Sequence, residues 1–93
     1  MPGMQVKVLE KAVHILELLA RSNKGLRLKD VAVSLSLNKT TALRILRVLE
    51  SHNLATRDGA NAFALGTRVF WWGTRYQRRF RLLRLVRPCL EQL

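Results

Sequence analysis

The amino-acid sequence predicts a mainly α-helical domain of three helices and a β-hairpin, followed by a separate C-terminal helix. Three observations predict this class. Apolar residues recur at helical spacing over residues 8–21 and again over residues 38–51. An Asp-Gly pair at residues 58–59 separates two short strand-like runs, which is typical of a hairpin. An aromatic, arginine-rich segment then resumes helical spacing beyond residue 67.

The first predicted helix spans residues 8–21. Its apolar face consists of Val8, Ala12, Ile15, Leu16 and Leu19. The segment SNKG at residues 22–25 should end this helix, because Asn and Gly tolerate the left-handed conformation that closes helices. The LRL segment that follows is too short for more than the edge of a small sheet. A short second helix near residues 30–35 and a turn lead into the next helix.

The third predicted helix begins at Lys39, because the side chain of Asn38 can accept a hydrogen bond from an amide of the first turn. At about 100° per residue, one face holds only aliphatic side chains and should be buried. That face consists of Ala42, Ile45, Leu46 and Leu49. The opposite face consists of Thr40, Leu43, Arg44, Arg47 and Ser51. It carries two guanidinium groups and no acid, while Glu50 lies to one side, and this pattern indicates an anionic partner.

Two short helices joined by a tight turn, the second with a basic outer face, form the sequence pattern of a helix-turn-helix. Asn53 is placed to end the third helix. The runs LATR and AFAL then flank the turn segment DGAN. Three helices followed by a hairpin make a winged helix-turn-helix, which we expect to cover residues 6–66.

Residues 67–93 are expected to form a linker or dimerisation helix outside the winged domain. A common helical stripe is formed by Trp72, Tyr76, Phe80 and Leu83, with arginines around the remainder, so the segment is predicted to be amphipathic. Pro88 is expected to break or kink this helix. The stripe has three interpretations: packing against the winged core, pairing with a second copy, or lying on a membrane. Pairing with a second copy is favoured. Helix-turn-helix proteins bind palindromic DNA sites as two-fold symmetric dimers, and such a dimer needs a surface that pairs with itself.

The composition favours a phosphate-rich partner. Ninety-three residues allow one small domain with a tail, and the formal net charge is +11, with twelve arginines and five lysines. Guanidinium groups bind phosphate oxygens in pairs and contact guanine edges. The single cysteine, Cys89, cannot form an intramolecular disulfide, which favours a reducing, cytoplasmic setting. No apolar run approaches the roughly 20 residues of a membrane span, and no signal peptide is recognisable.

Neither catalysis nor metal binding is predicted. The sequence contains no Gly-rich phosphate loop and no recognisable pairing of a nucleophile with a base, so an enzyme is not expected and no cofactor is implied. His14, His52 and Cys89 lack the spacing of a metal site, and we expect the two histidines to be structural or exposed.

Several of these segments together resemble the DNA-binding domain of IclR-type bacterial transcriptional regulators. The resemblance covers about residues 6–66, and its most specific match is LNKTTALRILRVLE at residues 37–50, followed by AFALG at residues 62–66. It continues more loosely through RLLRLVRPCLEQL. The resemblance implies a winged domain that binds operator DNA, a linker helix that pairs subunits, and a C-terminal effector-binding domain.

The sequence departs from the family's pattern at several positions. Arg27 stands where a Ser or Thr usually caps the second helix. Ser36 replaces the usual turn glycine and is expected to keep out of the left-handed region. Asn38 replaces a common proline but retains capping chemistry, and Phe63 occupies a place usually held by tyrosine.

The resemblance implies that Lys39, Thr40, Thr41 and Arg44 enter the major groove or hold its phosphates. In a winged domain, Arg44 and Arg47 suit guanine edges or phosphates, and the two threonines suit phosphates or thymine methyl groups. Arg57 and Asn61 are candidates for the minor groove or its phosphates, although Asn61 also suits the turn. Arg27 and Lys29 are candidate phosphate clamps. The predicted DNA-binding residues are Lys39, Thr40, Thr41, Leu43, Arg44, Arg47, Arg27, Lys29, Arg57 and Asn61.

We therefore expect a homodimer that binds double-stranded DNA through the third helix and pairs through Trp72, Tyr76, Phe80 and Leu83. The resemblance also implies that an effector would bind a domain absent from this chain, because Leu93 lies where that domain would begin; a fragment is favoured over a stand-alone protein. The alternative function is a winged module whose basic face binds an acidic protein or RNA.

Overall fold

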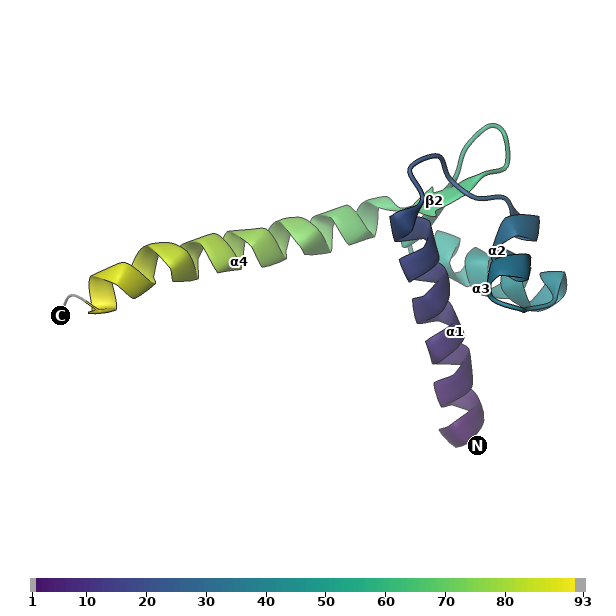
Figure 1. The fold of residues 1–93 in the computed structure, drawn as a ribbon, viewed down its shortest axis with the longest axis horizontal. Coiled ribbons are helices and arrows are strands. Elements are labelled where there is room, and N and C mark those ends of the chain that lie inside the picture. The colour runs from purple at the N-terminus through teal and green to yellow at the C-terminus, as the bar shows by residue number, and fades with distance from the viewer. Residues whose placement is uncertain (1, 92–93) are drawn as a thin grey trace.

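The computed structural model describes the backbone of residues 2–91 and the side chains of residues 7–82 and 84. A helical body carries a hairpin at one edge, and a long helix projects away from it (Figure 1). In chain order the elements are α1 (Pro2–Arg21), α2 (Leu28–Ser34), α3 (Lys39–Ser51), β1 (Ala55–Arg57), β2 (Phe63–Leu65) and α4 (Thr67–Glu91). The predicted class, three helices and a hairpin wing followed by a C-terminal helix, is confirmed.

Helix α1 begins at Pro2, earlier than the expected start at residue 8. Proline is well suited to the first helical position, because its fixed φ matches the helix and its missing amide hydrogen has no partner there. The helix ends at Arg21, as expected. Gly25 then reverses the chain with a φ of 80°, and a Cβ at this position would lie 3.1 Å from the Cβ of Ala62. The loop therefore passes close to the hairpin.

The core joins the three helices to the base of the hairpin. Its buried side chains are Ile15, Leu19, Val31, Ala32, Ala42, Ile45, Leu46, Leu49, Ala55 and Phe63. All four predicted core residues of α3 belong to this cluster, which confirms the assignment of the buried face of that helix. Phe63 is the largest fully buried side chain. The hairpin is thus held to the helices by an aromatic ring from β2.

Helix α2 begins at Leu28 although its N-cap residue, Arg27, has no acceptor in its side chain. The backbone amide of Arg27 instead donates to Oδ2 of Asp30 at 3.3 Å, which is the reciprocal half of a capping box. An acidic side chain in the first turn also suits the positive end of the helix dipole. The departure from the usual Ser or Thr therefore leaves the start of α2 in place.

The turn between α2 and α3 corrects the expectation for Ser36, which lies in the left-handed region with a φ of 55°. The amide of Ser36 donates to the carbonyl of Val33, and the amide of Leu37 donates to the carbonyl of Ala32 at 2.9 Å. These two hydrogen bonds close the C-terminus of α2 only when the residue just past the helix, here Ser36, has a positive φ. That conformation favours glycine. The turn geometry prevails over the preference of the serine.

Helix α3 begins at Lys39 as predicted. Oδ1 of Asn38 accepts a hydrogen bond from the amide of Thr41 at 2.7 Å, so Asn38 is the N-cap. At the other end, the amide of Leu54 donates to the carbonyl of Leu49 at 2.8 Å, and Asn53 has a φ of 60°. Asn53 therefore closes α3 by the same type of bonding that closes α2.

The hairpin pairs β1 with β2 in antiparallel register, with Ala55 opposite Leu65. The turn differs from a two-residue Asp-Gly turn: Asn61 rather than Gly59 has the positive φ, at 61°. Oδ1 of Asp58 accepts from the amides of Ala60 and Ala62 at 2.8 and 3.0 Å. The short LRL segment contributes one bridge between Leu26 and Phe63, which agrees with its expected role as a sheet edge.

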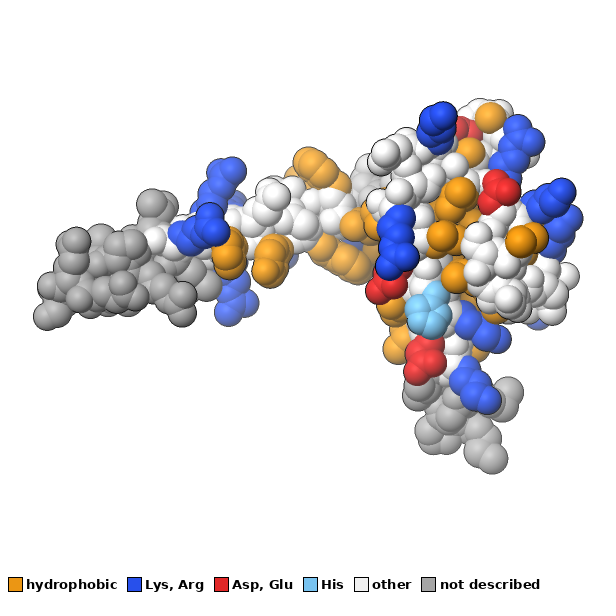
Figure 2. Space-filling model, in the orientation of Figure 1, with side chains coloured by type: hydrophobic (Ala, Val, Ile, Leu, Met, Phe, Trp, Pro, Cys, Tyr) orange, Lys and Arg blue, Asp and Glu red, His pale blue; other side chains and the backbone are white. Residues whose placement is uncertain are grey.

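Helix α4 passes through Pro88 and ends at Glu91, so the expected break at this proline is wrong. Pro88 lies in the last turn, where only one intrahelical hydrogen bond is lost and few residues remain to be displaced. The helix stands out from the body, and its hydrophobic side chains project from it (Figure 2). Among the described residues, none of the helices combines the length and the apolar content that crossing a bilayer requires.

Candidate nucleic-acid interface

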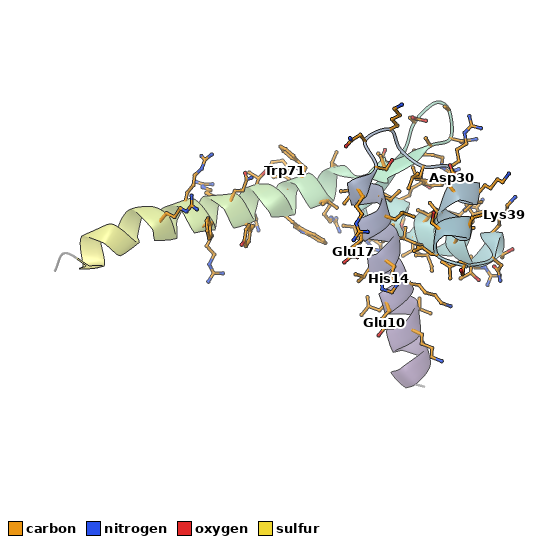
Figure 3. The ribbon with its side chains drawn as sticks, viewed as in Figure 1. Glu10, His14, Glu17, Asp30, Lys39 and Trp71 are labelled. Carbon is orange, nitrogen blue, oxygen red and sulfur yellow. The ribbon has the colours of Figure 1, made fainter. Side chains whose placement is uncertain are left out.

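The outward face of α3 is available to a partner. Thr40, Arg44 and Arg47 are exposed, while Ala42 and Leu46 on the opposite side have no accessible surface. Lys39 is exposed at the start of the helix, on the side of the body turned away from α4 (Figure 3). The helix therefore presents its cations outward and is anchored from behind, as the periodicity predicts.

The first turn of α3 combines a positive helix end with polar side chains. Thr40 is exposed and Thr41 is half-buried, directly after the Asn38 cap. The amides of a first turn and the positive end of the helix dipole favour an anion at this position. Val48, about two turns further along α3 on the same flank as Thr41, is also exposed and does not belong to the predicted DNA-binding residues.

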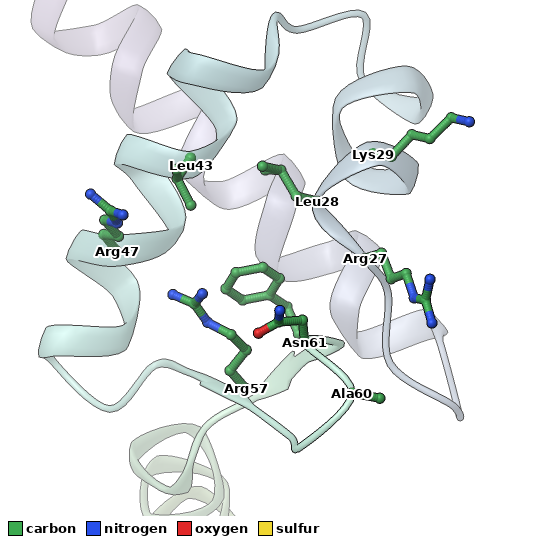
Figure 4. Close-up of a pocket in the computed structure, with 9 residues that line it drawn as sticks. Arg27, Leu28, Lys29, Leu43, Arg47, Arg57, Ala60 and Asn61 are labelled. Atoms are coloured by element: carbon green, nitrogen blue, oxygen red, sulfur yellow. The ribbon is translucent and has the colours of Figure 1, made fainter.

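A hollow of about 470 Å³ separates α3, the start of α2 and the wing (Figure 4). It brings together six of the ten predicted DNA-binding residues, which come from three segments of the chain. The lining residues are Arg27, Leu28, Lys29, Leu43, Arg47, Arg57, Ala60, Asn61 and Phe63. Four cations therefore line a partly apolar floor, a combination suited to a negatively charged molecule that also has apolar surface. In Figure 4 the charged ends of Arg27 and Lys29 point outward on the α2 side.

Leu43 differs from its expected outward position. It is half-buried and packs against the core, because α2 and the hairpin close over this flank of α3. Its side chain forms part of the hollow together with Leu28. The outermost line of α3 is thus made by Thr40, Arg44 and Arg47.

The guanidinium of Arg57 is fixed from two sides. Its Nη2 donates to Oε1 of Glu50 at 2.6 Å, and its Cζ lies 4.7 Å from the centroid of the Phe63 ring. The hydrogen bond to Glu50 is the main cause that raises the pKa of Arg57. Burial opposes it to a smaller extent, and the attraction of the carboxylate adds a still smaller increase. Both side chains retain about a third of their exposure, 32% for Arg57 and 28% for Glu50.

The wing turn is ordered by its own polar groups. The two backbone hydrogen bonds to Asp58 lower the pKa of its carboxyl group, and the charge of Arg27 acts in the same direction. Asn61 occupies the left-handed position of the turn, which is one of its two expected roles. It also lines the hollow, and its contact with DNA stays a prediction. Arg27 and Lys29 are exposed on the α2 side of the hollow.

The predicted dimerisation residues lie far from this hollow, along α4. Trp72, Tyr76 and Phe80 are exposed; the side chain of Leu83 lies outside the described residues. The rings of Tyr76 and Phe80 stack with centroids 6.1 Å apart, and Cζ of Arg84 lies 4.8 Å from the Phe80 centroid.

Helix α4 is less simply amphipathic than its sequence suggested. Phe70, Trp71 and Leu82 are also exposed, and at about 100° per residue they project on other sides of the helix than Trp72. Apolar surface is therefore not confined to the predicted stripe.

Sequence reasoning missed the floor of the hollow and the partner of Arg57. Leu28, Ala60 and Phe63 carry no charge and match no motif of nucleic-acid binding, so only their position identifies them. Glu50 was placed to one side of α3, but its pairing with a residue of the wing was not foreseen. His14 and His52 are exposed, in agreement with expectation. Within the described residues, no three His, Cys, Asp or Glu side chains are arranged to hold a metal ion.

Comparison with known proteins identifies the family. Residues 8–59 match the profile of the IclR helix-turn-helix domain. The HTH-type transcriptional regulator BhcR of Paracoccus denitrificans is 33% identical over 89 residues, which are 95% of this chain and 32% of that protein. The glycerol operon regulatory protein of Streptomyces coelicolor is 39% identical over 72 residues, which are 76% of this chain and 28% of that protein. The chain thus spans about a third of the length of these relatives.

Solved structures agree with this assignment. The IclR transcriptional regulator of Alicyclobacillus acidocaldarius matches with a TM-score of 0.70 and 32% identity, over 75% of this chain and 29% of that chain. The Thermotoga maritima IclR structure matches with a TM-score of 0.74 at 20% identity, over 84% of this chain and 32% of that chain, and so supports the fold. The relatives are transcriptional regulators and not enzymes. The chain therefore belongs to the IclR family, and residues 8–59 are its IclR-type helix-turn-helix DNA-binding domain.

Proposed function

We propose that the chain binds double-stranded operator DNA sequence-specifically, with α3 in the major groove. The observation that carries this proposal is the exposed line of Thr40, Arg44 and Arg47, supported from behind by buried aliphatic side chains. A helix fits the major groove of B-form DNA, and a helix-turn-helix presents its second helix there. Arg44 and Arg47 contact guanine edges or phosphates, and Thr40 and Thr41 contact phosphates or thymine methyl groups.

The hollow beside α3 receives the sugar-phosphate backbone of one strand. Arg27 and Lys29 approach it from α2, and Arg57 and Asn61 approach it from the wing. Deoxyribose offers apolar surface to Leu43, while the phosphates face the cations. These contacts position the domain on the duplex and carry no direct sequence information. Lys39, at the first turn of α3, holds a further phosphate.

The chain binds DNA as a homodimer on a palindromic site. Trp72, Tyr76, Phe80 and Leu83 of α4 pair with the same residues of a second copy, which removes exposed aromatic surface from water. Residues 6–66 form the winged domain, and residues 67–93 form the linker segment that contains α4. A regulator that acts by occupying bacterial DNA works in the cytoplasm.

Selection of bound sequences from random duplexes tests this function directly. It should return a two-fold symmetric motif whose half-sites are one helical turn or a multiple of it apart. Arg44→Ala and Arg47→Ala should each weaken binding to the selected duplex by about 1 to 3 kcal/mol if they contact a base. Arg81→Ala is the matched control, since it removes the same charge from α4 and should have a smaller effect.

The salt dependence separates this function from the alternative of a protein-binding or RNA-binding module. Neutralising phosphates releases counterions, so the affinity for duplex DNA should fall steeply as the salt concentration rises. No enrichment of any duplex, or unchanged binding in both α3 variants, would overturn the proposal. Tighter binding to single-stranded RNA than to any duplex would favour the alternative.

A further inference from the structure

The wing arginine is bound to its own domain before any partner arrives. Arg57 comes from β1 and Glu50 from the last turn of α3, and their hydrogen bond of 2.6 Å joins the wing to α3. The ring of Phe63 supports one face of the guanidinium at 4.7 Å. Arg57 also lines the hollow beside Arg47 (Figure 4). Its position therefore depends on residues from α3 and from both strands.

We propose that Glu50 is a positioning residue, which holds the Arg57 guanidinium in the orientation that binds a DNA phosphate in the hollow. This inference rests on the proposed function and adds a specific role for an acidic residue of α3. Glu50 acts through Arg57 and makes no contact with DNA itself.

The donor count of the guanidinium supports this role. Arginine has five N–H donors in a rigid planar fork, and Nη2 forms the one ion pair described for Arg57. The other donors remain for an anion in the hollow that Arg57 lines. A guanidinium already held in place loses less conformational freedom when it binds a phosphate. Glu50 thus lowers the entropic cost of the contact.

The placement of the carboxylate supports the same conclusion. An acid beside a phosphate site would normally weaken binding by repulsion. Here the Glu50 carboxylate is paired with the Arg57 guanidinium, and its side chain is 28% exposed. The other acids of this region, Asp30 and Asp58, accept backbone hydrogen bonds at the start of α2 and in the wing turn. Among the described residues, Glu50 is the acid that forms an ion pair with a cation of the hollow.

A double-mutant cycle tests whether Glu50 acts through Arg57. The four proteins are wild type, Glu50→Ala, Arg57→Ala and the double variant, each titrated with the selected duplex and with a scrambled duplex by fluorescence anisotropy. Glu50→Ala should weaken binding to the selected duplex about three- to tenfold, and the double variant should equal Arg57→Ala. Glu50→Gln keeps the acceptor oxygen and should restore most of the lost affinity. Thermal unfolding of each variant verifies that it is folded.

Two results would overturn the role of Glu50. Tighter binding by Glu50→Ala, to the same extent with and without Arg57, would show that the carboxylate acts only as a repulsive charge. Additive losses in the double variant would show that Glu50 acts independently of Arg57. If either result appears while Arg44→Ala and Arg47→Ala weaken binding, this inference fails and the proposed function stands. If neither the wild type nor any variant binds a duplex, the proposed function itself fails.

Discussion

Gly66 lies directly against the main chain of Asn53, so that a Cβ atom at Gly66 would stand 2.3 Å from the Asn53 carbonyl oxygen. Two hydrogen bonds of 2.9 Å accompany this approach. The amide of Gly66 donates to the carbonyl of Leu54, and the amide of Arg68 donates to the carbonyl of Asn53. The first turn of α4 is therefore attached to the end of α3. The direction in which α4 leaves the winged domain depends on a residue without a side chain.

Gly66→Ala should destabilise the domain by roughly 1 to 3 kcal/mol, because the added methyl group meets backbone atoms that cannot rotate away. Gly73→Ala is the matched control. A Cβ at Gly73 has no neighbour within 4 Å, and Ala is about 0.5 to 1 kcal/mol better than Gly inside a helix, so this variant should be more stable. Urea unfolding followed by circular dichroism measures both. Equal effects of the two substitutions would contradict the close packing at Gly66.

Ser36→Gly should stabilise the domain by about 0.5 to 1 kcal/mol. The left-handed conformation costs an L-residue roughly 1 to 2 kcal/mol, and the greater freedom of glycine in the unfolded chain offsets part of the gain. Ser34→Gly makes the same chemical change within α2, where the backbone is helical, and should destabilise by about 0.5 kcal/mol. Thermal unfolding compares the pair. A loss of stability in both would mean that Ser36 does not carry the strain its φ indicates.

Asn38→Ala should cost about 1 kcal/mol of unfolding free energy, because the amide of Thr41 loses the acceptor that lies 2.7 Å away. Asn38→Ser and Asn38→Asp retain a capping oxygen and should remain close to wild type. Amide hydrogen exchange in the first turn of α3 gives a local readout beside global unfolding. Unchanged protection of the Thr41 amide in Asn38→Ala would rule out the cap.

Asp58 should make the stability of the domain depend on pH in the acid range. Folding lowers the pKa of this carboxyl group below the ordinary value of 3.8, so its contribution is fully present above that pH. It should disappear as the pH falls through the lowered value in the folded protein. The difference in unfolding free energy between wild type and Asp58→Asn should therefore be constant near neutral pH and shrink below pH 3.8. If the difference in unfolding free energy stays constant into the acid range, the pKa of Asp58 is not lowered by folding.

Dimer formation through α4 should depend on the side of the helix that carries the predicted stripe with Trp72 and Tyr76. Replacing Trp72 and Tyr76 together by Ala should raise the dissociation constant of the dimer by about tenfold or more, since truncation of central interface aromatics commonly has large effects. The matched control replaces Phe70 and Trp71, which are as exposed but project elsewhere. Sedimentation over a range of concentrations distinguishes the two pairs. A monomeric wild type, or equal weakening by both pairs, would argue against the stripe as the interface.

Much of the fold was predictable because the relevant physics is local in the chain. The burial of Ala42, Ile45, Leu46 and Leu49 follows from spacing along one helix, and the Asn38 cap involves a residue three positions away. The hairpin was foreseen at the right place, although Asn61 and not the Asp-Gly pair supplies its left-handed residue. Local patterns thus determined which segments form helices and which face of α3 points outward.

Contacts between distant segments decided the rest. The sequence could not place Glu50 against Arg57 or Phe63 beneath it, since these contacts exist only after α3 and both strands have packed around one core. The conformation of Ser36 was set by the closing bonds of α2, against the preference of the residue itself. By itself the sequence determined a basic winged helix-turn-helix domain with an outward row of cations. Tertiary structure alone turned separate cations into one hollow, because packing brings together side chains that no periodicity relates.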